Sequence, residues 1–319
     1  MKKMYFVSLV ILALSMLFFP LAAGDNSKVG EGLPTIGGGD NLFIFEQDGQ
    51  TLRVLRSESG KIEEMKVEDY LFCVVAAEMP ALYETEALKA QAVAAYTYAL
   101  RKANASKSDY DITDSSTTDQ AFVEKATARE KWGSNADLYE EKITSAIKSV
   151  LYKKIVFDGK PILAAYHAIS SGKTENVSDI WGGDYPYLSS VDSVGDKLSP
   201  NYLSTAVFSA DEFCENLKDL VELSGDGASW LGEMVRTEAG SVKGIMIGGQ
   251  EISGDKIRSA FSLRSANFDI SFADNKFTFT VRGYGHGIGM SQYGAHYLAM
   301  QGKNYKEILL HFYTGCEIT

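Results

Sequence analysis

The chain of 319 residues is poor in cysteine and has no surplus of positive charge. Its three cysteines, Cys73, Cys214 and Cys316, are odd in number and widely spaced, which argues against a disulfide framework or a tetrahedral zinc pattern. An exported chain would still allow one bridge between Cys214 and Cys316. Acidic residues outnumber basic ones by 42 to 31, so the sequence lacks the basic stripe that nucleic-acid binding requires. No internal repeat is visible.

The N-terminus combines two lysines with a long uncharged stretch, residues 4–24, of about a bilayer's thickness. The positive charge predicts a cytoplasmic start, with the rest of the chain outside. A signal peptide cleaved near Ala22–Gly24 stays open as an alternative, but the run exceeds the usual core of roughly 7–15 residues. We therefore expect a single-pass membrane anchor over 1–24, a flexible tether over 25–40 and a globular domain over 41–319.

Helical and strand patterns alternate without a βαβ rhythm, which predicts an α+β fold with mixed helices and antiparallel strands. Pro80 disfavours the helical conformation at Met79, so one long helical block is split into helices over 67–78 and 85–102. A hairpin turn is expected at Asp274-Asn275. Further helices are expected over 135–152, 211–220, 255–261, 290–301 and 305–313, and strands over 41–56, 154–169, 233–238 and 241–247.

Glu78 has the strongest chemical signature in the sequence. Leu71, Val74 and Val75 are spaced to share a helix face with it, so its carboxyl group should point toward apolar surroundings. Burial and the negative end of the helix dipole both favour the protonated form, which a general acid requires. The alternative is a glutamate that only ends a helix, exposed or paired with a nearby lysine or arginine.

Three blocks of sequence are similar to a known family. They are "VVAAEMP…EALKAQAVAAYTYAL", "YHAISSGKTENVSDIWGGDYPYLSSVDS" and "RGYGHGIGMSQYGAHYLAMQGKNYKEILLHFYTGCEI", in that order. The chain resembles the SpoIID/LytB family, most of all its stage II sporulation protein D branch, over roughly residues 41 to 319.

The resemblance implies a membrane-anchored lytic transglycosylase that acts on peptidoglycan during engulfment in sporulation. Its catalytic acid would be Glu78, which would protonate the bond between MurNAc and GlcNAc and then accept the C6 hydroxyl proton as a 1,6-anhydro ring closes. The substrate would be glycan strands already stripped of stem peptides by a partner amidase, and other engulfment membrane proteins would be partners. No cofactor is implied.

Two departures from the family pattern concern the site. Tyr96 stands where the family usually has an arginine that could contact substrate, and a tyrosine offers stacking and one hydrogen bond without charge. The stretch "DITDSSTTDQAF" has no cysteine or histidine where some relatives carry them, so no metal is expected there.

Two polar or glycine-rich segments supply the remaining candidates for substrate binding. The polar segment is either a glycan-binding loop or a solvated turn. The glycine-rich segment is either a backbone surface against which a sugar ring lies, ending at a helix N-terminus, or a structural turn with a core histidine. The candidates are Tyr166, His167, Ser170, Ser171, Lys173 and Thr174 in the first segment, and Gly285, His286, Gly287, Ser291 and Gln292 in the second.

Two other classes of function stay open. The same broad family contains non-catalytic amidase enhancers that bind wall components or a hydrolase, and Tyr96 keeps that alternative in play. A weaker alternative is a metallohydrolase that uses His167 and His286.

Overall fold

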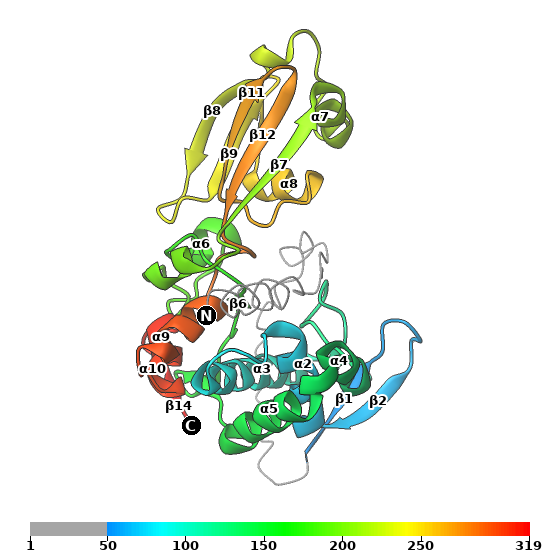
Figure 1. Ribbon diagram of the computed structural model, residues 1–319, viewed down its shortest axis with the longest axis vertical. Coiled ribbons are helices and arrows are strands. Elements are labelled where there is room, and N and C mark those ends of the chain that lie inside the picture. The colour runs from blue at the N-terminus through cyan, green and yellow to red at the C-terminus, as the bar shows by residue number, and fades with distance from the viewer. Residues whose placement is uncertain (1–49) are drawn as a thin grey trace, which may run out of the picture.

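The structure, a computed structural model, describes residues 50–319, which form two bodies with separate hydrophobic cores. We call residues 50–202 together with 283–319 the helical body, and residues 203–282 the sheet body. Figure 1 shows the sheet body above the helical body. The predicted membrane segment, the tether and the first strand expected after it lie outside the described residues. Within the described part of the chain, no helix is long and apolar enough to span a membrane.

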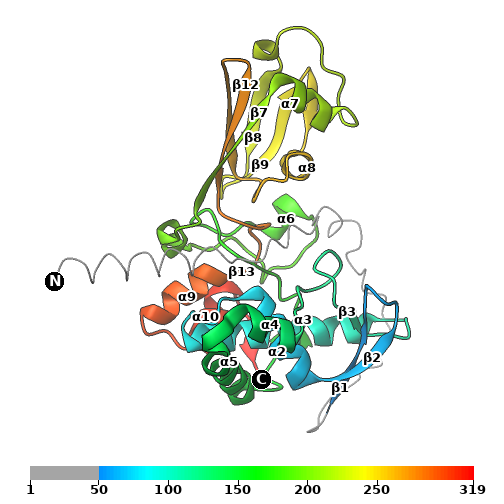
Figure 2. The same ribbon diagram turned by 45° about the vertical axis from the view of Figure 1, so that its right-hand side comes forward.

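Helix α3, Thr85–Ala105, forms the centre of the helical body. Many of its buried residues are alanines, whose small side chains let neighbouring helices approach closely. The predicted break at Pro80 is confirmed, because α2 ends at Glu78 and Met79 is extended. Helices packed against α3 surround it in Figure 2. The other helices of this body are α2 Val67–Glu78, α4 Lys125–Trp132, α5 Ala136–Val150, α6 Val177–Ile180, α9 Gln292–Met300 and α10 Tyr305–Phe312.

The strands of the helical body are short and form three small sheets. The orders are β2-β1-β3, β14-β4-β5 and β13-β6, and the pairs β1–β3 and β13–β6 are parallel. The strands are β1 Thr51–Leu55, β2 Ile62–Lys66, β3 Ile112–Thr113, β4 Ile155–Phe157, β5 Lys160–Pro161, β6 Tyr166–His167, β13 Met290–Ser291 and β14 Glu317–Ile318.

The sheet body consists of two antiparallel three-stranded sheets, β11-β12-β7 and β10-β9-β8, with two helices. Its core is aromatic, and the rings of Phe213 and Phe277 stack with centroids 3.8 Å apart. The chain enters and leaves this body side by side, since Leu203 pairs with Arg282. The elements are β7 Leu203–Ser209, α7 Ala210–Leu217, β8 Leu231–Arg236, β9 Val242–Ile247, β10 Gln250–Ile252, α8 Gly254–Ala260, β11 Phe268–Ala273 and β12 Lys276–Arg282.

Most of the expected elements are present, and the mixed helices and antiparallel sheets confirm the α+β class. Asp274 and Asn275 both have positive φ, 50° and 58°, as a tight hairpin turn requires. The expected helix over 85–102 continues to Ala105, while β2, β3 and α4 were not expected. Strand β2 is almost entirely exposed and therefore lacks the alternation of polar and apolar residues that marks a strand.

The bridge considered between Cys214 and Cys316 is wrong, because all three cysteines are free. Cys214 packs against the core of the sheet body, whereas Cys316 belongs to the core of the helical body. Cys73 is buried in the same core as Cys316, as the apolar run around it predicts.

Candidate active site

Glu78 is the last residue of α2, and its carboxyl group is held by donors from two distant segments. Val74 and Val75, one turn earlier, are fully buried, so the same helix face directs Glu78 inward. Its Oε1 accepts a hydrogen bond from the backbone N–H of Ala121 at 2.9 Å, and its Oε2 accepts one from Nε2 of Gln292 at 3.0 Å. The residue keeps some exposed surface.

The surroundings of the Glu78 carboxyl group favour its protonated form. Desolvation by the densely packed protein raises the pKa of Glu78, and hydrogen bonds from Ala121, Gln292 and Tyr166 partly oppose that rise in pKa. All three donors are neutral. A carboxyl group in such a place retains its proton at a higher pH than an exposed glutamate, which suits it to donate that proton to a bound molecule.

Tyr166 and Gln292 reach Glu78 because β6 and β13 pair in parallel. Met290 lies opposite Tyr166 in this pair, and the N–H of Met290 donates to the carbonyl oxygen of Ala165 at 3.1 Å. Gln292 then follows as the first residue of α9, which Ser291 caps by accepting a hydrogen bond from the backbone. The pairing of β6 with β13, two residues on each strand, thus positions the side chains of Tyr166 and Gln292 at the site.

The glycines before β13 let this segment interlock with residues 165–175. A Cβ atom added at Gly289 would lie 2.0 Å from the carbonyl oxygen of Ala165, and one at Gly285 would lie 2.8 Å from Cβ of His167. The sides without Cβ atoms therefore face the protein's own chain, which corrects the expectation of an open wall for a sugar ring. All four alternating glycines have positive φ: Gly283, Gly285, Gly287 and Gly289.

The two histidines near this segment are buried or crowded and uncharged. Nδ1 of His167 donates to the carbonyl oxygen of Ile288 at 3.1 Å, while Nδ1 of His286 accepts from the N–H of Ile288 at the same distance. Burial lowers the pKa of His167 to about 4 and the pKa of His286 well below its usual value. In residues 50–319, no group of three or more His, Cys, Asp or Glu side chains is arranged to hold a metal ion.

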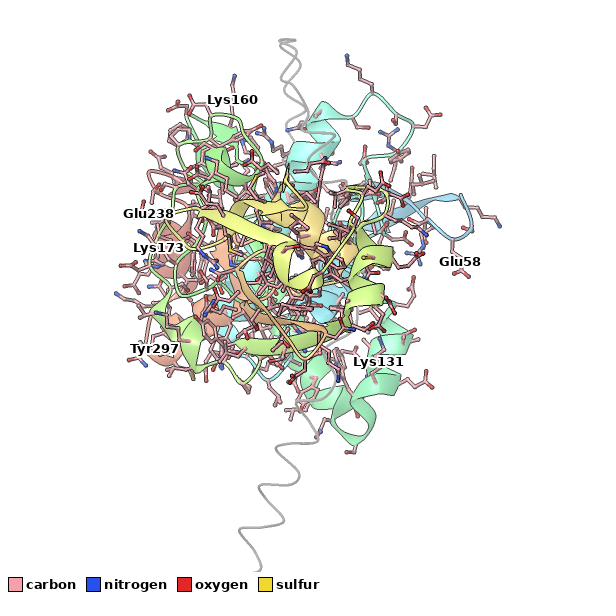
Figure 3. All side chains as sticks on the ribbon, turned by 90° about the horizontal axis from the view of Figure 1, so that it is seen from above. Glu58, Lys131, Lys160, Lys173, Glu238 and Tyr297 are labelled. Carbon is pink, nitrogen blue, oxygen red and sulfur yellow. The ribbon has the colours of Figure 1, made fainter. Side chains whose placement is uncertain are left out.

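The polar loop after β6 is tied to other parts of the protein. Ser170 is buried and bonded to Asp196, and Thr174 is fully buried and bonded to residue 191. Ser171 donates to the carbonyl oxygen of residue 239 at 2.8 Å, and Lys173 forms an ion pair with Glu238 of the sheet body. Figure 3 shows Lys173 and Glu238 close together. Ser171 and Lys173 therefore connect the two bodies, whereas Ser170 and Thr174 fix the loop within the helical body. None of the four bonds to Glu78.

Tyr96 is not part of the site as placed by the structure. Its side chain is buried, its hydroxyl group donates to Oε1 of Gln50 at 3.3 Å, and its ring packs against Tyr152. The expectation that Tyr96 occupies a substrate position is therefore corrected: α3 turns this residue toward the N-terminal strand region.

Sequence reasoning missed three buried polar residues that organise the site. Gln120 accepts a hydrogen bond from the Tyr166 hydroxyl at 2.7 Å, and Gln91 accepts one from Gln292 at 3.4 Å. Asp196 accepts from Ser291 at 2.8 Å and thereby holds the start of α9. No local pattern marks them, because each acts on a residue at least 46 positions away.

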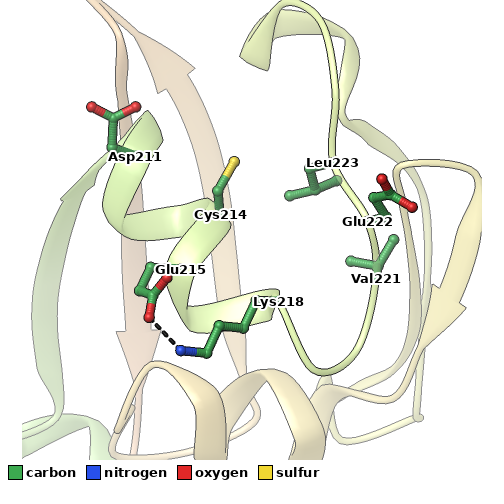
Figure 4. A pocket seen from close by; sticks show the side chains of 7 residues that line it. All are labelled: Asp211, Cys214, Glu215, Lys218, Val221, Glu222 and Leu223. Carbon is green, nitrogen blue, oxygen red and sulfur yellow. Dashed lines mark hydrogen bonds and ion pairs between the residues drawn. The ribbon is translucent and has the colours of Figure 1, made fainter.

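One hollow among the described residues lies away from Glu78. About 480 Å³ in volume, it is in the sheet body between α7 and the loop that follows it (Figure 4). It contains none of the candidate residues, and its lining mixes carboxylates with Cys214 and Lys218. We place the site at Glu78 because a desolvated carboxyl group with three directed donors has a defined chemistry, which an open hollow lacks.

Comparison with known proteins covers most of the chain. The chain is 38% identical over 271 residues to stage II sporulation protein D of Bacillus amyloliquefaciens, and this match spans 83% of the chain and 78% of the relative. The protein of the same name from Bacillus subtilis is 37% identical over 275 residues, spanning 84% of this chain and 79% of the relative. The chain belongs to the stage II sporulation protein D family.

The family model itself, described as SpoIID, stage II sporulation protein, matches residues 56–157. That range contains Glu78 and Ala121, while Tyr166 and Gln292 follow after it. A further relative of this sporulation family member is the amidase enhancer of Bacillus subtilis, 26% identical over 304 residues. This match spans 77% of the chain and 40% of the enhancer, so the similarity covers less than half of the enhancer.

Proposed function

We propose that the protein is a lytic transglycosylase that cleaves the bond between MurNAc and GlcNAc in denuded peptidoglycan strands during engulfment, with Glu78 as acid and base. The observation that carries the proposal is the desolvated carboxyl group of Glu78 with its neutral donors. Membership of a sporulation family supports a role in the cell wall.

In the first step, protonated Glu78 gives its proton to the glycosidic oxygen as the bond to the muramoyl C1 breaks. The carboxylate that remains is stabilised by the N–H of Ala121, the amide of Gln292 and the hydroxyl of Tyr166. The same carboxylate then accepts the proton of the C6 hydroxyl, and O6 bonds to C1. Glu78 is protonated again, and no water is consumed.

The use of one carboxylate fits the donors found at the site. Hydrolysis of a glycoside normally needs a second carboxylate, about 5–10 Å from the first, as nucleophile or base. The groups that bond Glu78 are an amide, a hydroxyl and a backbone N–H, so the surroundings favour intramolecular attack by the C6 hydroxyl.

We also propose that residues 1–24 anchor the protein in the cell membrane, with the two bodies outside, and that an amidase prepares its substrate. Removal of stem peptides would leave strands slim enough to approach a carboxyl group that is only partly exposed.

Mass spectrometry of denuded glycan strands incubated with the purified chain tests the proposal. Products ending in 1,6-anhydro-MurNAc are expected from the natural chain and not from Glu78→Gln. Glu68→Gln is the matched control, because it changes a partly exposed glutamate in the first turn of the same helix. Equal product from Glu78→Gln, or products with reducing MurNAc ends, would rule the mechanism out.

A second function is favoured by the likeness to the amidase enhancer. In that case the chain would bind wall material and stimulate an amidase without cutting glycan. Stem-peptide release by an added N-acetylmuramoyl-L-alanine amidase, measured with and without the chain, separates the two functions. Stimulation that persists in Glu78→Gln, with no anhydro product from either chain, would establish the enhancer role.

A further inference from the structure

Gln120 is buried and its amide group has a defined orientation. Its Nε2 donates to the hydroxyl oxygen of Tyr70 at 2.9 Å and to the carbonyl oxygen of Ala95 at 3.4 Å. A carbonyl oxygen only accepts hydrogen bonds, so the NH₂ group must face Ala95. The amide oxygen therefore faces Tyr166, whose hydroxyl donates to it at 2.7 Å.

The hydroxyl group of Tyr166 has one hydrogen and two acceptors within reach. Besides Gln120 it bonds the carboxyl group of Glu78, which it stabilises in the charged form. When Glu78 is protonated, the hydrogen of Tyr166 can stay with Gln120. When Glu78 is charged, the hydrogen is drawn to the carboxylate and the buried oxygen of Gln120 loses its donor.

We propose that Gln120 is a positioning residue that favours the protonated form of Glu78 by competing for the single hydroxyl hydrogen of Tyr166. The cost falls on the charged form alone, because a buried acceptor left without a donor is unfavourable. The inference rests on the proposed function for its consequence: it would keep the general acid loaded before substrate arrives.

The other donors to Glu78 do not compete in this way. The N–H of Ala121 is bonded to the carboxyl group, and the amide of Gln292 bonds it in addition to Gln91. Both can donate a hydrogen bond to the protonated and to the charged carboxyl group, and neither leaves another buried acceptor without a donor. Tyr166 is therefore the donor through which the surroundings can distinguish the two forms.

The titratable groups that face this network are neutral or paired. Tyr70 on α2, Tyr98 on α3 and Tyr313 after α10 lie near Tyr166, and burial raises the pKa of each. Asp119, next to Gln120, forms an ion pair with Lys102 at 2.8 Å. Glu78 is therefore the carboxyl group in this cluster that has no cationic partner, and its pKa is raised by burial.

Two nearly isosteric variants separate this idea from a loss of packing. Gln120→Met removes the competing acceptor, so Tyr166 bonds the carboxylate permanently and the pKa of Glu78 falls. Tyr166→Phe removes the donor, so the pKa of Glu78 rises. A merely loosened, wetter site would lower the pKa of Glu78 in both variants. In the Tyr166→Phe background, Gln120→Met should have no further effect.

The measurement is the pH titration of the Glu78 side-chain carbonyl by carbon NMR, in the full chain labelled with ¹³C-glutamate and assigned by loss of the signal in Glu78→Gln. A hydrogen bond to a charged group is worth about 1.5 kcal/mol, so each variant should change the ratio of protonated to charged Glu78 roughly tenfold, in opposite directions. Shifts of the Glu78 pKa in the same direction in both variants, or no shift in Gln120→Met, would overturn the proposal. If Gln120→Met does not fold, an unchanged or lowered titration midpoint of Glu78 in Tyr166→Phe would overturn it.

The titration needs no substrate, so its failure is distinct from failure of the proposed function. Opposite pKa shifts without any anhydro product would support the positioning role of Gln120 and refute the proposed transglycosylase activity. With product formed, the alkaline limb of its pH profile should move to lower pH in Gln120→Met and to higher pH in Tyr166→Phe.

Discussion

Replacing Gly289 by alanine should damage both the stability of the helical body and the site. Gly289 has φ +71°, and an added Cβ atom would lie 2.0 Å from the carbonyl oxygen of Ala165. That oxygen belongs to the backbone and accepts the N–H of Met290, so it cannot rotate away as a side chain would. The two strands β6 and β13 would have to separate.

The size of the effect follows from two contributions. A left-handed conformation costs a residue with a Cβ atom about 1–2 kcal/mol, and overpacking a dense interior adds about 1–3 kcal/mol. Gly289→Ala should therefore lower the free energy of unfolding by about 2–5 kcal/mol. Since domains are stable by about 5–15 kcal/mol, this is a large loss.

Gly302→Ala is the matched control. Gly302 also has a positive φ, +85°, but no atom lies within 4 Å of an added Cβ, so only the conformational cost of about 1–2 kcal/mol applies. Urea denaturation of the natural and variant chains, followed by circular dichroism, measures both losses. The reasoning is refuted if the two variants agree within about 0.5 kcal/mol. Gly289→Ala should also lose anhydro product at least tenfold, because Tyr166 and Gln292 leave Glu78.

Three smaller outcomes are expected. Burial raises the pKa of Asp196 to about 6, so the folded chain holds this proton more tightly than the unfolded one. Stability should fall by about 3 kcal/mol in all as the pH rises from about 3 to about 7, and denaturation of Asp196→Asn should lack that fall. Tyr96→Phe should cost at most about 1 kcal/mol and leave product formation unchanged, since its hydroxyl reaches only Gln50 in the structure; lost activity would return Tyr96 to the site. Asn304→Ala should lower stability by about 1 kcal/mol in thermal denaturation, because Asn304 and Glu307 cap α10 reciprocally; an unchanged melting temperature would contradict this.

Features that depend on neighbouring residues could be predicted from the sequence. Pro80 marks the end of α2, Asp274-Asn275 form the hairpin turn, and Asn304 caps α10. The inward direction of Glu78 follows from its spacing to Val74 and Val75.

Other features depend on which distant segments meet. The glycines before Met290 were recognised as unusual, but their partner, residues 165–175, is set by packing between segments more than 100 positions apart. Tyr96 lies on a helix whose buried residues surround it almost completely, so spacing alone does not tell which side faces the site.

Local chain chemistry is enough to make Glu78 a buried carboxyl group at a helix end, because helix periodicity and the residue before proline act over a few positions. The groups that surround the Glu78 carboxyl come together only in the tertiary structure, because Ala121 and Gln292 bond Glu78 across 43 and 214 positions of the chain. Hydrogen bonds over such separations leave no periodic trace in a single sequence, and they form when the helices and the β6–β13 pair pack together.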